Sequence, residues 1–300
     1  MPHVLTLIAA PGALSPSHIN AARAALTTLG ADCDASDWLA DHEAADLPFT
    51  ALAAEQAIAA VRAALGNAPL DLIAQPLAGR RKKLLLADMD STIVTSETLD
   101  EMAAFAGLKE RIAEITARSM NGELDFRQAL TERVGMLRGL DESALQETWK
   151  ATEFMPGAAE LVATMRAHGA HTALVSGGFT FFTERVAERV GFHEHHANTL
   201  LLEAGKLTGA VGQPILDRDA KLATLKRLAA GMGLPLGEAA AVGDGANDLA
   251  MIQAAGLGVA FRAKPIVAAA ARHRIEHADL RGLLYAQGYR AAEFVAGHTA

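Results

Sequence analysis

Three short apolar runs in this sequence each end directly in polar or glycine-rich residues, and this pattern restricts the fold more than any other feature. The runs are residues 84–87, 172–175 and 239–242, and a fourth follows at 258–261. Strands of a parallel sheet read as continuous apolar runs because helices bury both of their faces. Helix-like stretches at 158–168, 179–190, 219–231 and 247–255 separate the runs. This alternation predicts an α/β fold with a doubly wound parallel sheet.

Composition limits the setting in which the chain works. Its 300 residues are 51% apolar but only 5% aromatic, and the formal net charge is −8. The basic cluster at 80–83 is short, so we expect no nucleic-acid partner. No apolar run reaches the ~18 residues of a membrane span, and the N-terminus lacks the basic start of a signal peptide. The single cysteine, Cys33, leaves no disulfide to form, and we expect a cytoplasmic protein.

The first 80 residues are expected to form a separate small α+β domain, and residues 81–300 the main one. Strands are expected at 3–10 and 70–75 and helices at 16–29 and 54–66, in the order β-α-β-α-β. In size and element order this domain resembles the ACT type of ligand-binding or dimerising module, which implies a possible homodimer. The polar run 79–83 reads as a short linker.

Residues 95–154 interrupt the alternation of strands and helices. They are rich in charge and in helix formers and contain no parallel-strand signal. Because they follow the first buried strand directly, they are expected to form a helical cap over the active site.

Four polar motifs follow the buried strands or lie on the adjoining helix. They are Asp88-Met89-Asp90-Ser91-Thr92, Ser176-Gly177-Gly178-Phe179, Lys221, and Gly243-Asp244-Gly245-Ala246-Asn247-Asp248. Alone, the first could be a solvated turn, the second an ordinary strand-to-helix turn, and Lys221 a surface lysine. Ligands of doubly wound sheets bind beyond the carboxyl ends of the strands, so the four can converge there. Together they supply carboxylates, a hydroxyl and an ammonium, as metal-assisted phosphoryl transfer requires.

These motifs, in this order, resemble the haloacid dehalogenase superfamily, whose sheet is Rossmann-like. Within it, residues 84 to about 285 resemble the phosphoserine phosphatases. The cap carries a matching signature in Glu97, in Ser119-Met120-Asn121-Gly122, in Phe126 and in Arg133-Val134. The resemblance implies hydrolysis of O-phospho-L-serine, the last step of serine biosynthesis, through an aspartyl-phosphate and with Mg²⁺ as cofactor.

The resemblance also implies a role for each matching residue. Asp88 would be the nucleophile and Asp90 the general acid and base. Magnesium would bind the carboxylates of Asp88 and Asp244 and the backbone carbonyl of Asp90, with Asp248 orienting this shell. The implied substrate-binding residues are Ser176, Gly177, Lys221 and Asn247 for the phosphate, Glu97 for the ammonium, Arg133 for the carboxylate, and Met120 and Phe126 for the walls.

Several alternatives stay open at this point. Met120 and Phe126 can equally be core residues of the cap, and Glu97 and Arg133 can be a surface pair. A related small-metabolite phosphatase, or a phosphotransferase that uses phosphoserine, would have the same motifs. A dehalogenase would not need Asp90, and a transport ATPase would need membrane helices. A non-catalytic sensor of serine or phosphoserine would not need the intact acidic set.

Overall fold

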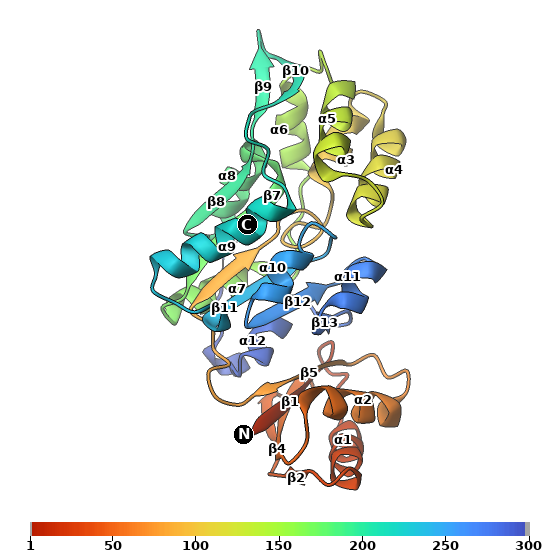
Figure 1. Cartoon of the computed structure of the whole chain (residues 1–300), viewed down its shortest axis with the longest axis vertical. Helices are drawn as coiled ribbons and strands as arrows, with labels where there is room; N and C mark the ends of the chain where they lie inside the picture. Colours follow the sequence, from red (N-terminus) through yellow and green to blue (C-terminus); the bar gives the residue numbers. More distant parts are fainter. Residues whose placement is uncertain (1, 298–300) are drawn as a thin grey trace.

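The computed structural model describes residues 2–297, and they form three parts along the long axis of the molecule (Figure 1). A central sheet with its helices separates a helical cap at one end from a small antiparallel domain at the other. Within the described residues, no helix has the length and apolar character needed to cross a bilayer.

The central sheet has six parallel strands in the order β13-β12-β11-β6-β7-β8, which confirms the predicted doubly wound fold. The strands are β6 (Leu84–Ala87), β7 (His171–Phe179), β8 (Glu194–Asn198), β11 (Ala239–Gly243), β12 (Leu257–Phe261) and β13 (His273–Ile275). After β6 the chain builds β7 and β8 on one side, then returns to place β11 on the other. The order of strands therefore reverses at β6, and the crevice at its carboxyl end is the expected ligand site.

Helices cover both faces of this sheet, which explains why its strands are apolar throughout. Leu84 and Leu86 pack against α9 (Arg218–Gly231) and α10 (Leu249–Ala254). Leu85 and Ala87 belong to the core of the opposite face. That face is covered by α7 (Ala158–Ala167), α8 (Thr180–Val190) and α12 (Gly282–Ala286). The remaining elements of this part are α11 (Pro265–Ala270) and two short 3₁₀ turns, Leu236–Glu238 and Ala291–Glu293.

The cap consists of four helices inserted after β6, as its composition predicted. They are α3 (Thr98–Ala104), α4 (Lys109–Met120), α5 (Phe126–Met136) and α6 (Ser143–Lys150). A hairpin of β9 (Leu200–Glu203) and β10 (Lys206–Val211), which the sequence reasoning missed, packs against α5 (Figure 1). Backbone hydrogen bonds from Gly139 N to Leu207 O and from Glu142 N to Gly205 O join the hairpin to the cap.

The N-terminal part contains more strands than the predicted β-α-β-α-β order, which was wrong. Its elements are β1 (His3–Ile8), α1 (Pro16–Thr28), β2 (Asp32–Cys33), β3 (Asp37–Ala40), β4 (Ala44–Thr50), α2 (Ala54–Leu65) and β5 (Asp71–Pro76). The sheet is antiparallel in the order β2-β4-β1-β5, with β3 paired to β4. Strands β2 and β3 are only two and four residues long, and β4 contains an aspartate and a proline, so none of the three reads as the apolar run of a central strand.

Both faces of this N-terminal sheet are covered. Leu5, Leu7 and Leu47 pack against α1 and α2. Ile8 and Ile73 point the other way and belong to the same apolar core as the catalytic part. Edge strand β5 lies beside β13, the edge strand of the central sheet. Two edges that would otherwise expose backbone groups therefore protect each other.

A buried carboxylate joins these two edges. Asp71, only 2% exposed, accepts backbone N–H groups from Glu276 (2.8 Å), His277 (3.1 Å) and Ala278 (2.9 Å). Nearby, Gln75 Nε2 donates to the carbonyl of Ala286 at 2.6 Å. These hydrogen bonds are buried, so they hold the N-terminal sheet firmly against the C-terminal segment.

The basic run at 79–83 is part of this docking and not the free linker that its polarity suggested. Lys82 is 8% exposed; its Nζ donates to the carbonyls of Gly79 and Gly237, and its N–H donates to Gln287 Oε1. Arg80 forms an ion pair with Asp46. Arg80 thus binds the run to the N-terminal sheet, and Lys82 binds it to the catalytic part.

Candidate active site

The four polar motifs meet at the carboxyl ends of β6, β7 and β11, under the cap. They enclose a chamber of about 30 Å³. Its lining residues are Asp88, Asp90, Glu97, Leu99, Met120, Phe126, Leu130, Arg133, Ser176, Gly177, Gly178, Asp244 and Asn247. Small-molecule pockets usually measure roughly 300 Å³ or more, so the cap is closed over the sheet here.

Asp88 lies at the centre of the site and is held by a buried lysine. Lys221 Nζ donates to Asp88 Oδ1 at 2.5 Å and to Asp248 Oδ1 at 2.6 Å. Burial disfavours the ammonium, but the two carboxylates outweigh it and raise the pKa of Lys221. Helix α9 presents this lysine from its first turn, and Asp217 caps that turn by accepting the N–H groups of Asp219 and Ala220.

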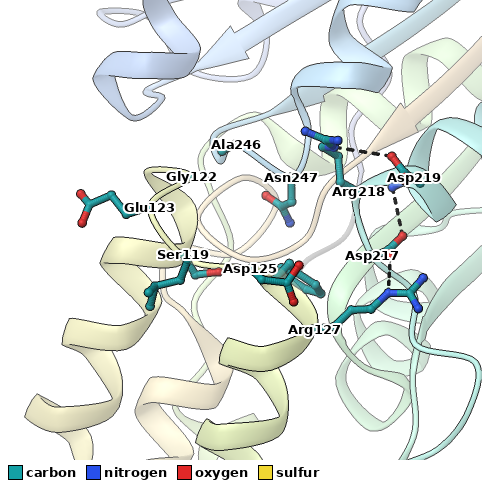
Figure 2. A pocket seen from close by; sticks show the side chains of 12 residues that line it. Ser119, Gly122, Glu123, Asp125, Arg127, Asp217, Arg218, Asp219, Ala246 and Asn247 are labelled. Atoms are coloured by element: carbon teal, nitrogen blue, oxygen red, sulfur yellow. Dashed lines mark hydrogen bonds and ion pairs between the residues drawn. The ribbon is translucent and has the colours of Figure 1, made fainter.

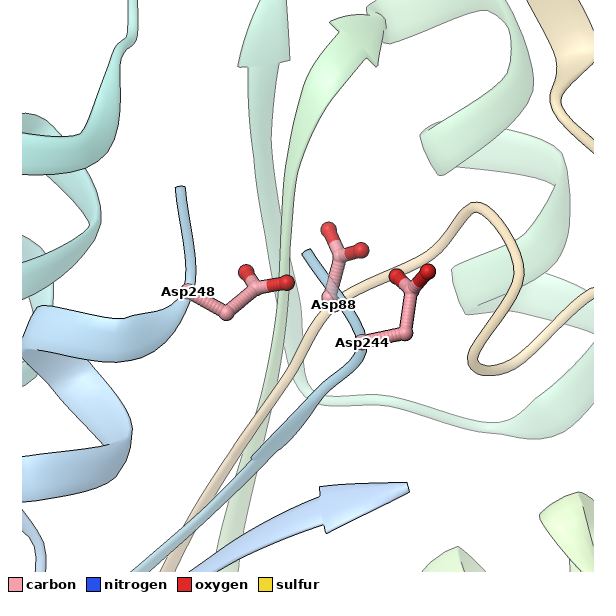
Figure 3. A group of neighbouring side chains, drawn as sticks. All are labelled: Asp88, Asp244 and Asp248. Atoms are coloured by element: carbon pink, nitrogen blue, oxygen red, sulfur yellow. The ribbon is translucent and has the colours of Figure 1, made fainter. Parts of the chain in front are cut away.

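Three buried carboxylates lie close to the ammonium of Lys221. Ligand oxygens of Asp88, Asp244 and Asp248 lie within 4.8 Å of one another (Figure 3). Burial and then the charge of Asp248 raise the pKa of Asp88, and the same two causes raise that of Asp244 to about 7. Asp244 Oδ2 is buried without a hydrogen-bond donor. Lys264 Nζ lies 3.8 Å from this oxygen, beyond hydrogen-bond distance, so the oxygen can still serve a divalent cation together with the neighbouring carboxylates, since hard cations take oxygen ligands.

Asp90 is positioned separately from this acidic cluster. Its Oδ1 accepts the N–H of Thr98 at 2.8 Å, and its Oδ2 accepts the hydroxyl of Ser176 at 3.1 Å. Ser91 then turns the chain with a φ of 56°, a conformation that non-glycine residues rarely adopt. Burial raises the pKa of Asp90, which favours a protonated carboxyl.

The serine-glycine motif lies where β7 becomes irregular. The sequence predicted a helix from residue 179, but β7 continues to Phe179 and α8 begins at Thr180. A side chain at Gly177 would approach Phe126 Cζ to 2.5 Å, and one at Gly178 would approach Asp90 Oδ2 to 2.8 Å. A side chain at either position would therefore displace Phe126 or Asp90 from its place in the chamber.

The cap contributes one acid and one base to the chamber. Glu97 accepts the hydroxyl of Ser91 at 2.8 Å, and burial together with the charges of Asp90 and Asp244 raises its pKa to about 8. Arg133 is 3% exposed and donates through Nη1 to Thr116 Oγ1 at 2.8 Å. These positions rule out the exposed surface pair that the sequence left open.

Sequence reasoning missed the residues that orient these side chains. The Thr116 hydroxyl accepts a hydrogen bond from Arg133 and donates one to Asp100 Oδ1 at 2.6 Å. All three side chains are buried. Thr98 holds Asp90 through its backbone N–H, which no side-chain pattern could reveal. A buried arginine, threonine and aspartate on three cap helices share no sequence spacing, so only the folded cap brings them together.

Residues 85–253 match the model of the haloacid dehalogenase-like hydrolases. The chain belongs to this family. It is 40% identical to a phosphoserine phosphatase of Streptomyces coelicolor over 92% of this chain and 68% of that one. It is 47% identical to a phosphoserine phosphatase of Streptococcus thermophilus, over 66% of this chain and 93% of that one.

Solved structures agree with this assignment. The structure described as a phospho-aspartyl intermediate analogue of phosphoserine phosphatase has 40% identity and a TM-score of 0.66, and covers 68% of this chain and 98% of that one. A HAD family hydrolase from Salmonella enterica serovar Typhi has 28% identity and a TM-score of 0.81. It covers 95% of this chain and 97% of that one, so the likeness extends beyond the catalytic part.

Proposed function

We propose that this protein is a phosphoserine phosphatase, which hydrolyses O-phospho-L-serine to L-serine and phosphate. The observation that carries the proposal is the closed chamber, which holds Asp88 and Asp90 together with an acid and a base from the cap, Glu97 and Arg133. Family relatives described as phosphoserine phosphatases support it. Two charged cap residues of opposite sign match the two charged ends of an amino acid.

In the first step Asp88 attacks the phosphorus and the bond from phosphorus to the serine oxygen breaks. Lys221 binds Asp88 Oδ1, which leaves Oδ2 to form the new bond to phosphorus. The same ammonium stabilises the negative charge of the phosphoryl group as it transfers. Ser176, the N–H of Gly177 and Asn247 are proposed to donate to the phosphate oxygens.

Asp90 moves the protons in both steps. It donates a proton to the departing serine oxygen, because an alkoxide is a poor leaving group at neutral pH. It then takes a proton from the water that attacks the phosphorus of the aspartyl-phosphate. The bond from phosphorus to Asp88 breaks, which releases phosphate and restores the free carboxylate. Its hydrogen bond from the backbone N–H of Thr98 fixes the carboxyl group for both transfers.

The divalent ion is proposed to be Mg²⁺. Asp88, Asp244 and the backbone carbonyl of Asp90 are the proposed ligands, and Asp248 orients the shell while it binds Lys221. When bound, the ion offsets the negative charge of carboxylate and phosphate, so that one anion can approach the other.

Glu97 and Arg133 are proposed to select the substrate. The ammonium of phosphoserine beside Glu97 would favour the ionised carboxylate in spite of burial. The Arg133 guanidinium would bind the substrate carboxylate with the N–H groups that Thr116 and the carbonyl of Ala129 do not use. Met120 and Phe126 close the chamber and exclude water.

Release of inorganic phosphate from O-phospho-L-serine, measured with Mg²⁺ and with a chelator, tests the proposal directly. We expect release only with the metal. The second candidate is a phosphotransferase that uses phosphoserine, since the same aspartyl-phosphate can pass to another alcohol. Transfer to added homoserine in preference to water would favour that candidate, and absence of both reactions would favour a sensor.

For residues 1–80 we propose an ACT-like domain that mediates self-association or binds an amino-acid effector such as serine. One face of its sheet packs on the catalytic part, so α1 and α2 offer the surface for this role. Mass by light scattering, with and without serine, tests it. A monomer whose activity and mass do not change when serine is added would refute it.

The lone cysteine, Cys33, supports a cytoplasmic setting.

A further inference from the structure

The cap and the catalytic sheet are joined by an ion pair outside the chamber. Arg127, on the first turn of cap helix α5, donates through Nε to Asp217 Oδ2 at 2.6 Å. The side chain of Arg127 is 60% exposed and that of Asp217 is 13% exposed. Figure 2 shows the pair at the edge of an outer pocket of about 370 Å³, with Asn247 nearby.

Asp217 serves two purposes at once. Its Oδ1 caps helix α9 by accepting the N–H groups of Asp219 and Ala220, both at 3.0 Å, while Oδ2 receives Arg127. The helix that it caps carries Lys221, which binds Asp88. The cap is therefore attached to the same helix turn that positions the nucleophile.

Arg127 also adjoins the wall of the chamber. Phe126, the preceding residue, lies over Gly177 and lines the inner chamber, whereas Arg127 lines the outer pocket and is absent from the chamber lining. A second link lies close by, where the N–H of Ala246 donates to the carbonyl of Met120 across the boundary between sheet and cap. An inner chamber of about 30 Å³ admits no substrate until these links separate.

We propose that Arg127 and Asp217 form a clasp that holds the cap closed and that opens and re-forms in each catalytic cycle. Arg127 is then a positioning residue: it contacts no reacting atom and acts through the closure of α5 over the phosphate site. The part of the proposal that concerns turnover rests on the proposed phosphatase function, whereas closure itself does not.

Two substitutions separate the clasp from the helix cap. Arg127→Gln removes the charge on the cap. Asp217→Asn removes the charge on the other side but keeps an oxygen for the N-cap, where Asn and Asp are equally good. Arg118→Gln is the matched control, because Arg118 is a half-exposed cap arginine whose partner, Glu123, is also in the cap.

The first readout is hydrogen exchange of the Ala246 amide, whose acceptor lies across the boundary. We expect Arg127→Gln and Asp217→Asn each to speed its exchange about fivefold, the size of one partly exposed ion pair. The double variant should be no faster than either single one, because both remove the same interaction. Arg118→Gln should match the parent.

The second readout is steady-state hydrolysis of phosphoserine. Both clasp variants should raise KM about fivefold and leave kcat within about twofold, since an open cap weakens substrate capture without altering the chemistry. If KM rises in Arg127→Gln but not in Asp217→Asn, Arg127 binds the substrate itself and the clasp is refuted. Unchanged Ala246 exchange in both variants also refutes it. A parent enzyme inactive on phosphoserine would overturn the proposed function, while the exchange experiment would still test the clasp.

Discussion

The carboxylate of Asp71 offers the sharpest test of how the N-terminal sheet is held. Asp71→Asn changes one oxygen to an amide nitrogen and leaves the shape unchanged. The oxygen that remains can keep the bond to Glu276 at 2.8 Å, but the new NH₂ then faces the N–H of Ala278, formerly 2.9 Å from Oδ2. Loss of one or two charge-assisted bonds, at about 1.5–3 kcal/mol each, predicts a destabilisation of about 3 kcal/mol.

Equilibrium urea unfolding, followed by far-UV circular dichroism, measures this change. Asp71 contacts no chamber residue, so kcat for phosphoserine in dilute buffer should stay at the parental value. Asp32→Asn, an exposed acid in the same sheet, is the matched control and should leave the midpoint unchanged. A destabilisation below about 1 kcal/mol would show that the three hydrogen bonds add little, because a typical single hydrogen bond already contributes that much.

Three further predictions concern the site and one buried histidine. Asp88→Asn should abolish turnover and phosphoenzyme formation in a folded protein; substantial phosphate release would refute the nucleophile, and beryllium fluoride should bind at Asp88 of the parent. Arg133→Ala should raise KM for phosphoserine roughly 30–150-fold, which corresponds to about 2–3 kcal/mol of lost binding free energy, and should change KM for an aryl phosphate far less. An equal rise in KM for both substrates would mean that Arg133 supports the fold. Burial, then the charge of Arg272, lowers the pKa of His273 from 6.5 to about 4. As pH falls from 6.5 to 4, His273 is therefore protonated in the unfolded chain before it is protonated in the folded one. This difference lowers the free energy of unfolding by about 3 kcal/mol. His273→Gln should flatten that part of the urea-midpoint profile against pH, and an unchanged slope would contradict this account.

The sequence predicted the central sheet and the meeting of its motifs because both follow from local patterns. A run such as residues 84–87 needs no distant partner to be recognised, and parallel strands bring their carboxyl ends to one edge. The acidic group of Asp88, Asp244 and Asp248 could be expected on the same grounds.

The features that sequence reasoning missed depend on contacts between distant segments. Asp71 binds backbone N–H groups more than 200 residues away, and any residue type can supply a backbone N–H. The linker at 79–83 looked solvated because Lys82 is charged, yet its ammonium is satisfied by two carbonyls. The hairpin strand β9 begins with three leucines, of which two remain exposed. Its apolar run therefore did not indicate whether the strand is buried.

The hairpin β9–β10 has a mechanical consequence for the cap. The cap joins the sheet through two adjacent segments, which pair where Val94 meets Phe154. Because Gly139 and Glu142 are bonded to the hairpin, any movement of the cap carries the hairpin with it, and the hairpin has its own root where Gly212 N donates to Thr199 O. A body attached at two separate places can turn only about the line through them. A cap that opens as one body with the hairpin would turn about this axis, and the end of α5 that bears Phe126 would then move along an arc away from Gly177.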